Sequence, residues 1–226
     1  MNFLLIGCNG NMGRQVAEVV SQQKCDKIIA GIDTKKSENH LDFPVYLNTK
    51  KVNKKIDAII DFSTCNNRQE YISFALKHNI PYACFSTICS SEDITLFENL
   101  AKSCPVLICK NTSIGVNLLY KLIDIACQYL PNADVAVNEY HHTLKKDMPS
   151  GTAKNIENIL SKSNIKFTTS SFRVGTEKGT HSVQFFLEDE IIEINHRANS
   201  RKIFALGALN LVHKLPNQPN GIYNYL

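Results

Sequence analysis

One short segment, residues 139–153, concentrates groups that could do chemistry. It places two adjacent imidazoles, His141-His142, shortly before an ammonium pair, Lys145-Lys146. An imidazole can move a proton near neutral pH, and an ammonium group can pair with a carboxylate. Ser150-Gly151-Thr152 then opens a predicted helix, whose first N–H groups lack intrahelical acceptors and can bind an anion. The segment therefore indicates chemistry on a small acidic molecule. An ordinary polar loop before a helix cap could have the same sequence pattern.

The N-terminus has the pattern of a dinucleotide site. An apolar run over residues 2–7 is typical of a buried parallel strand, and a glycine-rich turn and a helical pattern follow it. A second predicted strand, residues 27–33, ends at Asp33, whose carboxylate can accept hydrogen bonds from ribose hydroxyls. The glycine spacing is G-x-x-G-x-x-G rather than the commoner G-x-G-x-x-G, yet the order of elements favours a dinucleotide site over a plain strand–turn–helix unit. The residues of the turn are Gly7, Cys8, Asn9, Gly10, Asn11 and Met12.

Composition excludes several classes of protein. The 226 residues allow one large or two small domains, and a net charge of +4 is too slight to indicate a nucleic-acid partner. The eight cysteines form no C-x-x-C pair, so we expect reduced thiols and no metal site. Leu5-Ile6-Gly7-Cys8 resembles a lipoprotein cleavage box, but no basic residue precedes it and the apolar stretch is short. Since no run is long enough to span a membrane, we expect a cytoplasmic protein.

Strands and helices alternate in the first half of the chain. Further strands are predicted at residues 56–62, 81–85 and 105–109, with helices at 66–78 and 91–102, the latter capped by Ser91 and Asp93. Such alternation predicts a parallel sheet with helices on both faces.

The pattern changes after Asn111. A helix at 116–129, a strand at 134–140, a helix at 152–160 and three strands at 166–174, 181–188 and 190–197 precede a final helix at 203–215. Consecutive strands joined by short turns indicate an open mixed or antiparallel sheet. The chain is thus predicted to be α/β, with a Rossmann-like parallel-sheet domain (1–111 and 202–226) and a smaller α+β domain with an open mixed sheet (112–201).

With both segments in view, the sequence resembles the dihydrodipicolinate reductase (4-hydroxy-tetrahydrodipicolinate reductase) family nearly end to end. The most specific similarity is residues 139–153, where the family carries E-x-H-H-x-x-K-x-D-x-P-S-G-T-A. Ser113-Ile114-Gly115-Val116-Asn117, Arg173-Val174-Gly175 and residues 196–201 also fit. The family catalyses the second committed step of diaminopimelate and lysine biosynthesis.

The resemblance implies a role for each part of the chain. His141 and Lys145 would be catalytic, and His142, Ser150, Gly151 and Thr152 would hold the substrate carboxylates. The glycine turn would cradle the pyrophosphate and Asp33 the ribose. The nicotinamide end would meet Phe85, Ser86, Thr87, Asn111, Thr112 and Ser113. Phe85, Ser86 and Thr87 belong to the run Phe85-Ser86-Thr87-Ile88, which stands where the family usually has Gly-Thr-Thr-Gly. This departure bears on the cofactor contact.

The resemblance also implies NADH, NADPH or both as cofactor, a small cyclic dicarboxylate as substrate, and a homotetramer built by the second domain. Because Asp33 would repel a 2′-phosphate, whereas Lys35 and Lys36 could pair with it only as mobile charges, we expect NADH to serve at least as well as NADPH.

Two other functions are compatible with a dinucleotide domain. The first is another two-domain oxidoreductase, such as an amino-acid or sugar dehydrogenase, against which the His-His-x-x-Lys and Pro-Ser-Gly-Thr runs argue. The second is a nicotinamide-sensing regulator, which would not need proton donors beside an anion site and for which no basic recognition helix is found. Consumption of NADH with the family substrate separates all three.

Overall fold

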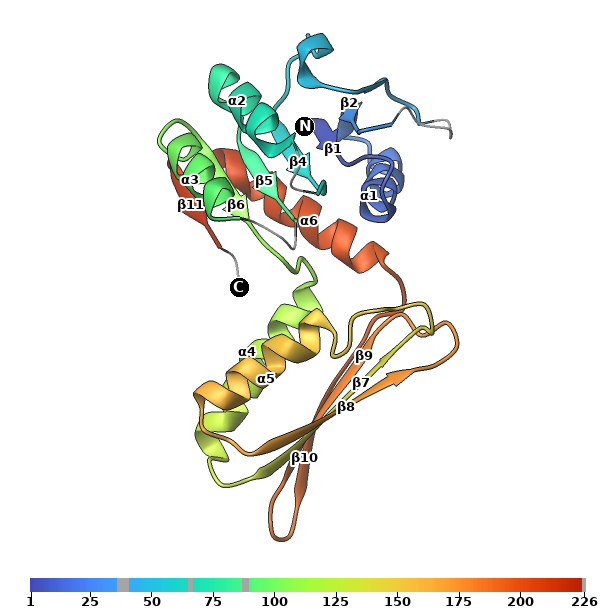
Figure 1. Ribbon diagram of the computed structural model, residues 1–226, viewed down its shortest axis with the longest axis vertical. Coiled ribbons are helices and arrows are strands. Elements are labelled where there is room, and N and C mark those ends of the chain that lie inside the picture. Colours follow the sequence, from blue (N-terminus) through green and yellow to red (C-terminus); the bar gives the residue numbers. More distant parts are fainter. Residues whose placement is uncertain (36–40, 65–66, 87–89, 225–226) are drawn as a thin grey trace. The chain divides into compact units, whose positions relative to one another are not determined.

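The computed structural model describes residues 1–35, 41–64, 67–86 and 90–224 (Figure 1). The chain folds into two compact units. The first unit comprises Met1–Thr112 and Lys202–Leu226, and the second comprises Ser113–Arg201. The first holds a parallel sheet and the second a mixed sheet, so the predicted fold class is confirmed. The assignment of cofactor binding to one unit and of substrate binding and oligomerisation to the other stays a prediction.

The sheet of the first unit has seven strands in the order β11-β6-β5-β4-β1-β2-β3, and every pairing is parallel. Five of these strands match predicted ones; β3 and β11 were not predicted, because two and three residues are too few for a periodic pattern to emerge. The strands are β1 (Asn2–Ile6), β2 (Lys27–Ile32), β3 (Val45–Tyr46), β4 (Ala58–Asp61), β5 (Tyr82–Cys84), β6 (Pro105–Ile108) and β11 (Gly221–Tyr223).

Helices cover both faces of this sheet. Alternate residues of β1 supply two cores: Phe3 and Leu5 pack with α1 and α6, while Leu4 and Ile6 pack with α2 and α3. Period-2 alternation in a strand buried on both faces produces this division. The helices are α1 (Asn11–Ser21), α2 (Arg68–His78), α3 (Ser91–Leu100) and α6 (Lys202–Lys214).

The cap of α3 differs from the prediction by one residue. Ser90, not Ser91, is the N-cap, since its hydroxyl accepts the Asp93 N–H at 3.1 Å while the Asp93 carboxylate accepts the Ser90 N–H at 2.8 Å. The reciprocal pair is a capping box, which requires the acidic residue three positions after the cap.

The sheet of the second unit has the order β10-β9-β7-β8. β7 pairs with β8 in parallel and with β9 in antiparallel fashion, so the sheet is mixed. Helices α4 and α5 pack on one face through a core that includes Ile123, Leu160, Val137 and Phe185. The elements are α4 (Ile114–Tyr129), β7 (Asp134–His141), α5 (Gly151–Lys162), β8 (Phe167–Arg173), β9 (Thr180–Phe186) and β10 (Ile191–Arg197). None of the helices in the described part has the length and apolar character needed to cross a membrane.

Candidate active site

The buried face of β7 changes character along the strand. Val135 and Val137 face the core, and the next two residues on the same face are Glu139 and His141, which are 0% and 8% exposed. Because side chains alternate along a strand, positions two apart share a face. The strand therefore begins in the apolar core and ends in a buried polar cluster.

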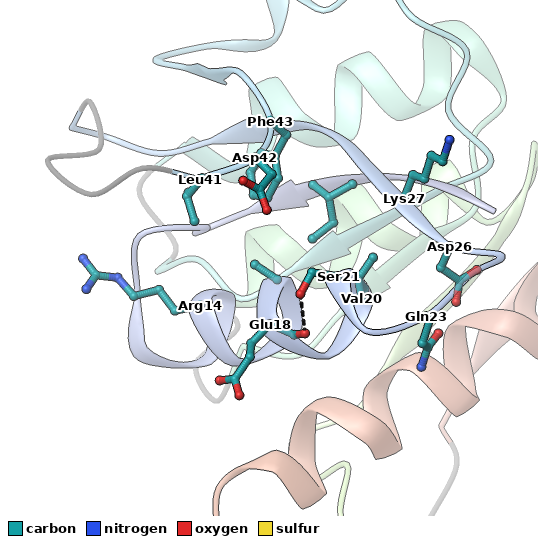
Figure 2. A pocket seen from close by; sticks show the side chains of 12 residues that line it. Arg14, Glu18, Val20, Ser21, Gln23, Asp26, Lys27, Leu41, Asp42 and Phe43 are labelled. Carbon is teal, nitrogen blue, oxygen red and sulfur yellow. Dashed lines mark hydrogen bonds between the residues drawn. The ribbon is translucent and has the colours of Figure 1, made fainter.

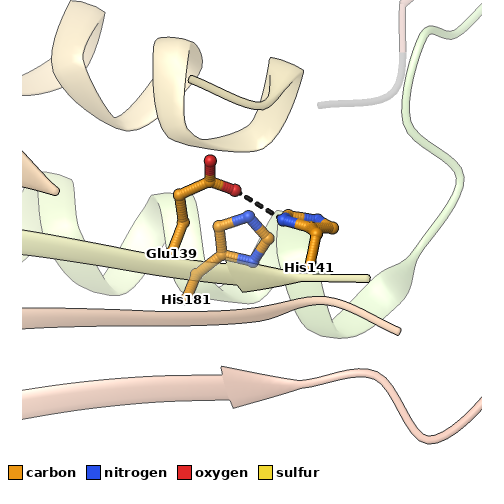
Figure 3. Close-up of side chains that lie close together, drawn as sticks. All are labelled: Glu139, His141 and His181. Atoms are coloured by element: carbon orange, nitrogen blue, oxygen red, sulfur yellow. Dashed lines mark ion pairs between the residues drawn. The ribbon is translucent and has the colours of Figure 1, made fainter. Parts of the chain in front are cut away.

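A buried carboxylate and two imidazoles make up this cluster (Figure 3). The Nδ1 atom of His141 lies 2.5 Å from Glu139 Oε2. His181 comes from the neighbouring strand β9, where it is paired with Glu139, and its ring meets that of His141 edge-on with centroids 5.3 Å apart. His141, predicted to be catalytic, is thus held by groups from two strands.

Burial controls the protonation of both imidazoles. It lowers the pKa of His141, although the Glu139 carboxylate acts in the opposite direction; the charge of Lys145 lowers this pKa further. Burial, followed by the neighbouring His141, lowers the pKa of His181 to about 3, so His181 is neutral near pH 7. Burial would raise the pKa of Glu139, but hydrogen bonds from Ser171 and Arg173 and the nearby His141 lower it overall. The cluster therefore holds an ionised carboxylate beside imidazoles that resist protonation.

The same cluster offers ligand atoms from Glu139, His141 and His181 within 4.8 Å of one another, as a metal site would. However, the Arg173 guanidinium donates to Glu139 Oε1 at 2.9 Å, and the charge of Lys145 acts on His141. A positive group on the carboxylate and a second one near His141 oppose a further cation. The geometry fits a carboxylate–imidazole pair better than a metal centre.

The predicted anion-binding turn has two different parts. Ser150 is buried: its N–H donates to Glu139 Oε1 at 3.3 Å, and its hydroxyl caps α5 by accepting the Ala153 N–H at 3.2 Å and lies 3.1 Å from His181 Nε2. Gly151 is exposed, and a Cβ placed there would meet no atom within 4 Å. The open side of the turn therefore belongs to Gly151 and Thr152, the first two residues of α5, whose N–H groups precede any intrahelical acceptor.

Arg173 holds the loop between β7 and α5. Besides Glu139, it donates to the carbonyl oxygens of Asp147 at 2.6 Å and Lys145 at 3.3 Å. The Lys145 ammonium, predicted to be catalytic, is 2.7 Å from the Asp147 carboxylate and partly exposed. His142, a predicted substrate residue, is half-buried and lies 3.4 Å from an Arg201 nitrogen. The loop thus presents its cations from an anchored backbone.

A polar cavity adjoins this cluster within the second unit. It measures about 520 Å³, and its lining includes Val174, Lys178 and Arg197. The Val174 N–H donates to the His141 carbonyl at 2.8 Å, which places the cavity next to the end of β7. The lining also includes Glu177, whose carboxylate accepts from Arg197 at 3.0 Å, so one of its two cationic groups is already paired.

In the first unit, the predicted glycine turn follows β1. Gly7 has φ +77°, a left-handed conformation that side chains rarely adopt, and a Cβ at Gly13 would come within 2.2 Å of the Gly7 carbonyl oxygen. Only glycines permit this tight turn into α1. Cys8 is buried, and burial raises the pKa of its thiol to about 12, so it serves as packing rather than as a nucleophile. Asn11 and Met12 open α1.

A cavity of about 340 Å³ lies beside this turn. Gly7, Asn9, Gly10 and Asp33 line it, together with Phe62, Ser63 and Tyr71 among others. The Asp33 carboxylate accepts the Asn9 N–H at 2.9 Å, so the acid at the end of β2 is fixed against the turn. The cavity brings three of the six predicted pyrophosphate residues together with the predicted ribose residue, and a nicotinamide dinucleotide fits this donor set.

Most of the described residues predicted to approach the nicotinamide have their side chains buried or engaged within the protein. Phe85 is buried and stacks on Phe62 with centroids 5.0 Å apart, and Ser86 is also buried. Thr112 is buried and donates its hydroxyl to the Phe204 carbonyl at 2.7 Å, while the Ser113 hydroxyl caps α4. Asn111 accepts the Cys109 thiol at its carbonyl. Their contact with a cofactor stays a prediction, and Thr87 lies outside the described residues.

A larger cavity of about 600 Å³ lies between α1 and the segment that follows β2 (Figure 2). Its lining in the described part includes Arg14, Glu18 and Phe43, but neither Gly7 nor Asp33. It is therefore separate from the cavity beside the glycine turn, and that turn gives it no phosphate-binding groups.

A parallel-sheet unit with a glycine turn and terminal acid, combined with a mixed-sheet unit carrying proton donors, defines a two-unit oxidoreductase of the Rossmann type. Solved structures of similar fold include dipicolinate-bound dihydrodipicolinate reductase from Paenisporosarcina sp. TG-14, with a TM-score of 0.83, 20% identity and coverage of 99% of this chain and 97% of that chain. A probable dehydrogenase from Thermotoga maritima also matches, with a TM-score of 0.63, 11% identity and coverage of 98% and 91%.

Sequence comparison narrows the class to one family. Residues 1–112 match the family model of the dihydrodipicolinate reductase N-terminus, and residues 115–225 that of its C-terminus. The chain is 36% identical to 4-hydroxy-tetrahydrodipicolinate reductase of Thermosipho africanus (100% of this chain, 96% of the relative) and 33% identical to that of Caldanaerobacter subterraneus subsp. tengcongensis (99% and 96%). The chain therefore belongs to the dihydrodipicolinate reductase family.

Sequence reasoning named His141 but missed its buried partners, Glu139 and His181. The sequence did contain a signal: buried and partly exposed residues alternate along β7, and the buried positions change from valine to glutamate and histidine. A charged residue at an inward position of a strand is a candidate functional group. The position of His181 opposite Glu139 could not be predicted from the sequence, because neither strand alone determines the register between β7 and β9.

Proposed function

We propose that this chain reduces 4-hydroxy-tetrahydrodipicolinate to tetrahydrodipicolinate in diaminopimelate and lysine biosynthesis. The observation that carries the proposal is the buried Glu139–His141 pair beside the open turn at Gly151, in a chain that matches the family over both halves. A nicotinamide would supply hydride to C4 of the substrate ring, from which the 4-hydroxyl group would leave as water. All other steps fall to the chain's own residues.

The chain would bind, orient and protonate the substrate. The N–H groups of Gly151 and Thr152 would receive one carboxylate, with Ser150 holding the turn and His142 contributing a further polar group. Protonated His141 and the Lys145 ammonium would supply a proton and offset negative charge as it develops. Since Lys145 is paired with Asp147, its ammonium would exchange one carboxylate partner for another on substrate binding.

The cofactor would lie along the glycine turn, with Asp33 toward the ribose. We propose that NADH serves at least as well as NADPH, because Asp33 is fixed by the Asn9 N–H at the edge of the cavity and would repel a 2′-phosphate.

We further propose a cytoplasmic homotetramer. The support is an apolar surface on the second unit: Ile114, Leu118, Leu122 and Ile125 of α4 are 41–64% exposed, whereas Leu119 and Ile123 of the same helix are buried. Contiguous exposed apolar residues of this kind are typical of an interface. Sedimentation velocity tests it, and a monomer at micromolar concentration would contradict it.

The deciding experiment couples the chain to the synthase that generates the substrate and follows NADH consumption. We expect turnover only when both synthase and chain are present. NADH consumption with an amino acid or a polyol instead would favour another oxidoreductase, and dinucleotide binding without turnover on any of these substrates would favour the regulator.

A further inference from the structure

The Glu139 carboxylate joins three parts of the candidate active site. Its Oε2 atom contacts His141 Nδ1 at 2.5 Å, and its Oε1 atom accepts from Arg173 at 2.9 Å and from the Ser150 N–H at 3.3 Å. The side chain is 0% exposed, so none of these contacts competes with bulk water. One buried anion thus touches the predicted proton donor, the arginine that anchors the loop, and the cap of the anion-binding turn.

We propose that Glu139 is a positioning residue that fixes the orientation of the His141 imidazole and the backbone of the Ser150 turn together. The inference deepens the proposed function and rests on it for the identity of the reaction. Glu139 touches no reacting atom; it acts through His141 and Ser150.

The surroundings of His141 support this role. With Nδ1 turned toward Glu139, the other ring nitrogen, Nε2, lies beside Gly179, 3.1 Å from where a Cβ would stand. Gly179 has φ +142° and leaves this space free. A carboxylate on one imidazole nitrogen fixes which nitrogen carries the proton in the neutral ring. Glu139 would therefore place a hydrogen on Nδ1 and leave Nε2 to carry the exchangeable proton.

The charged groups facing His141 determine how it titrates. Glu139 favours the imidazolium, whereas Lys145, Arg173 and burial oppose it. His181, which is neutral, contacts the His141 ring edge-on. Removing the Glu139 charge leaves the opposing groups in place, so His141 should become harder to protonate.

Glu139→Gln is the sharpest perturbation, because the amide keeps the shape but has one acceptor instead of two. If the amide oxygen keeps Arg173 and Ser150, the amide nitrogen faces His141 Nδ1 and opposes a proton there. We expect kcat to fall by ~10-fold or more, and the limb on which activity is lost with rising pH to move down by about one unit. The affinity for dipicolinate should change little, since the turn keeps its acceptor.

Glu193→Gln is the matched control. Glu193 lies in the same sheet, accepts the Ser182 hydroxyl at 2.8 Å and is exposed, away from His141. Its kcat, pH profile and dipicolinate affinity should equal those of the wild type. An unchanged pH profile in Glu139→Gln, or equal shifts in both variants, would overturn the proposal.

A second measurement needs neither a folded variant nor turnover. In wild-type protein labelled with ¹⁵N-histidine, the neutral His141 ring should carry its hydrogen on Nδ1. A neutral ring with its hydrogen on Nε2 would refute the role of Glu139 directly. If the wild type fails to consume NADH with the family substrate, the proposed function fails, yet the tautomer still decides the positioning role.

Discussion

At Gly151, addition of a single methyl group should weaken substrate binding without destabilising the fold. It is the first residue of α5, exposed, and a Cβ built there meets no protein atom within 4 Å. Gly151→Ala therefore introduces no clash in the free protein. Its methyl group would occupy the space from which a carboxylate would approach the N–H groups of the turn.

Gly151→Ala should raise the stability of the protein and lower its affinity for the substrate. Replacing glycine by alanine at a compatible helical position stabilises by about 0.4–1 kcal/mol, chiefly by reducing the entropy of the unfolded chain. A hydrogen bond to a charged group contributes roughly 1.5–3 kcal/mol, and tenfold in affinity corresponds to about 1.4 kcal/mol. Loss of one such bond should raise the substrate KM and the inhibition constant of dipicolinate roughly 10- to 100-fold, while the melting temperature stays equal or rises.

The assay combines steady-state kinetics, inhibition by dipicolinate, NADH binding and thermal unfolding. Ser161→Ala in the last turn of the same helix is the control, because it also improves helix propensity but lies at the far end of α5. It should leave every kinetic constant unchanged. Wild-type substrate and dipicolinate affinity in Gly151→Ala would show that the carboxylate binds elsewhere.

Three further predictions concern the predicted catalytic pair, the choice of cofactor and the titration of His181. His141→Ala and Lys145→Ala should each lower turnover by ~10²-fold or more with NADH affinity unchanged; wild-type rates would refute the catalytic assignment. The ratio of kcat/KM for NADH to that for NADPH should be at least one and should rise with ionic strength, since Lys–phosphate contacts are screened by salt; a strong NADPH preference at high salt would contradict the role of Asp33. His181, with its pKa lowered to about 3, stays neutral in the folded protein while the unfolded ring protonates below ~6.5. Stability should therefore fall as pH decreases from 6.5 toward 3, by about 3 kcal/mol at pH 4.5. Urea titrations of wild type, His181→Asn and the exposed control His78→Asn at pH 7 and 4.5 should show this component lost in His181→Asn alone.

The alternation of strands and helices made most of the fold predictable. Buried parallel strands such as β1 and β4 are continuous apolar runs, and glycine marks the turn after β1. By contrast, β3 and β11 are defined only by their pairing with a neighbouring strand, over two and three residue pairs. No local pattern encodes such a pairing, so neither could be read from the sequence.

Candidate site residues could be predicted where a local motif marks them and not where they depend on strand register. Gly7, Asp33 and the Gly151 turn have signatures within a few residues. The sequence could not reveal that the polar groups of Ser150 are largely engaged by Glu139, His181 and Ala153. Nor did the motif around Phe85 reveal that its ring stacks on Phe62 in the core.

The mixed topology of the second unit has a direct chemical consequence. Because β8 runs parallel to β7, Arg173 at the end of β8 pairs with His141 at the end of β7. Because β9 runs antiparallel, His181 near its beginning pairs with Glu139. Either strand reversed would bring the opposite end of its sequence to this edge, and Glu139 would lose one of its neighbours. The arrangement of strands, rather than the spacing of residues along the chain, is what assembles a carboxylate, a guanidinium and two imidazoles around one buried point.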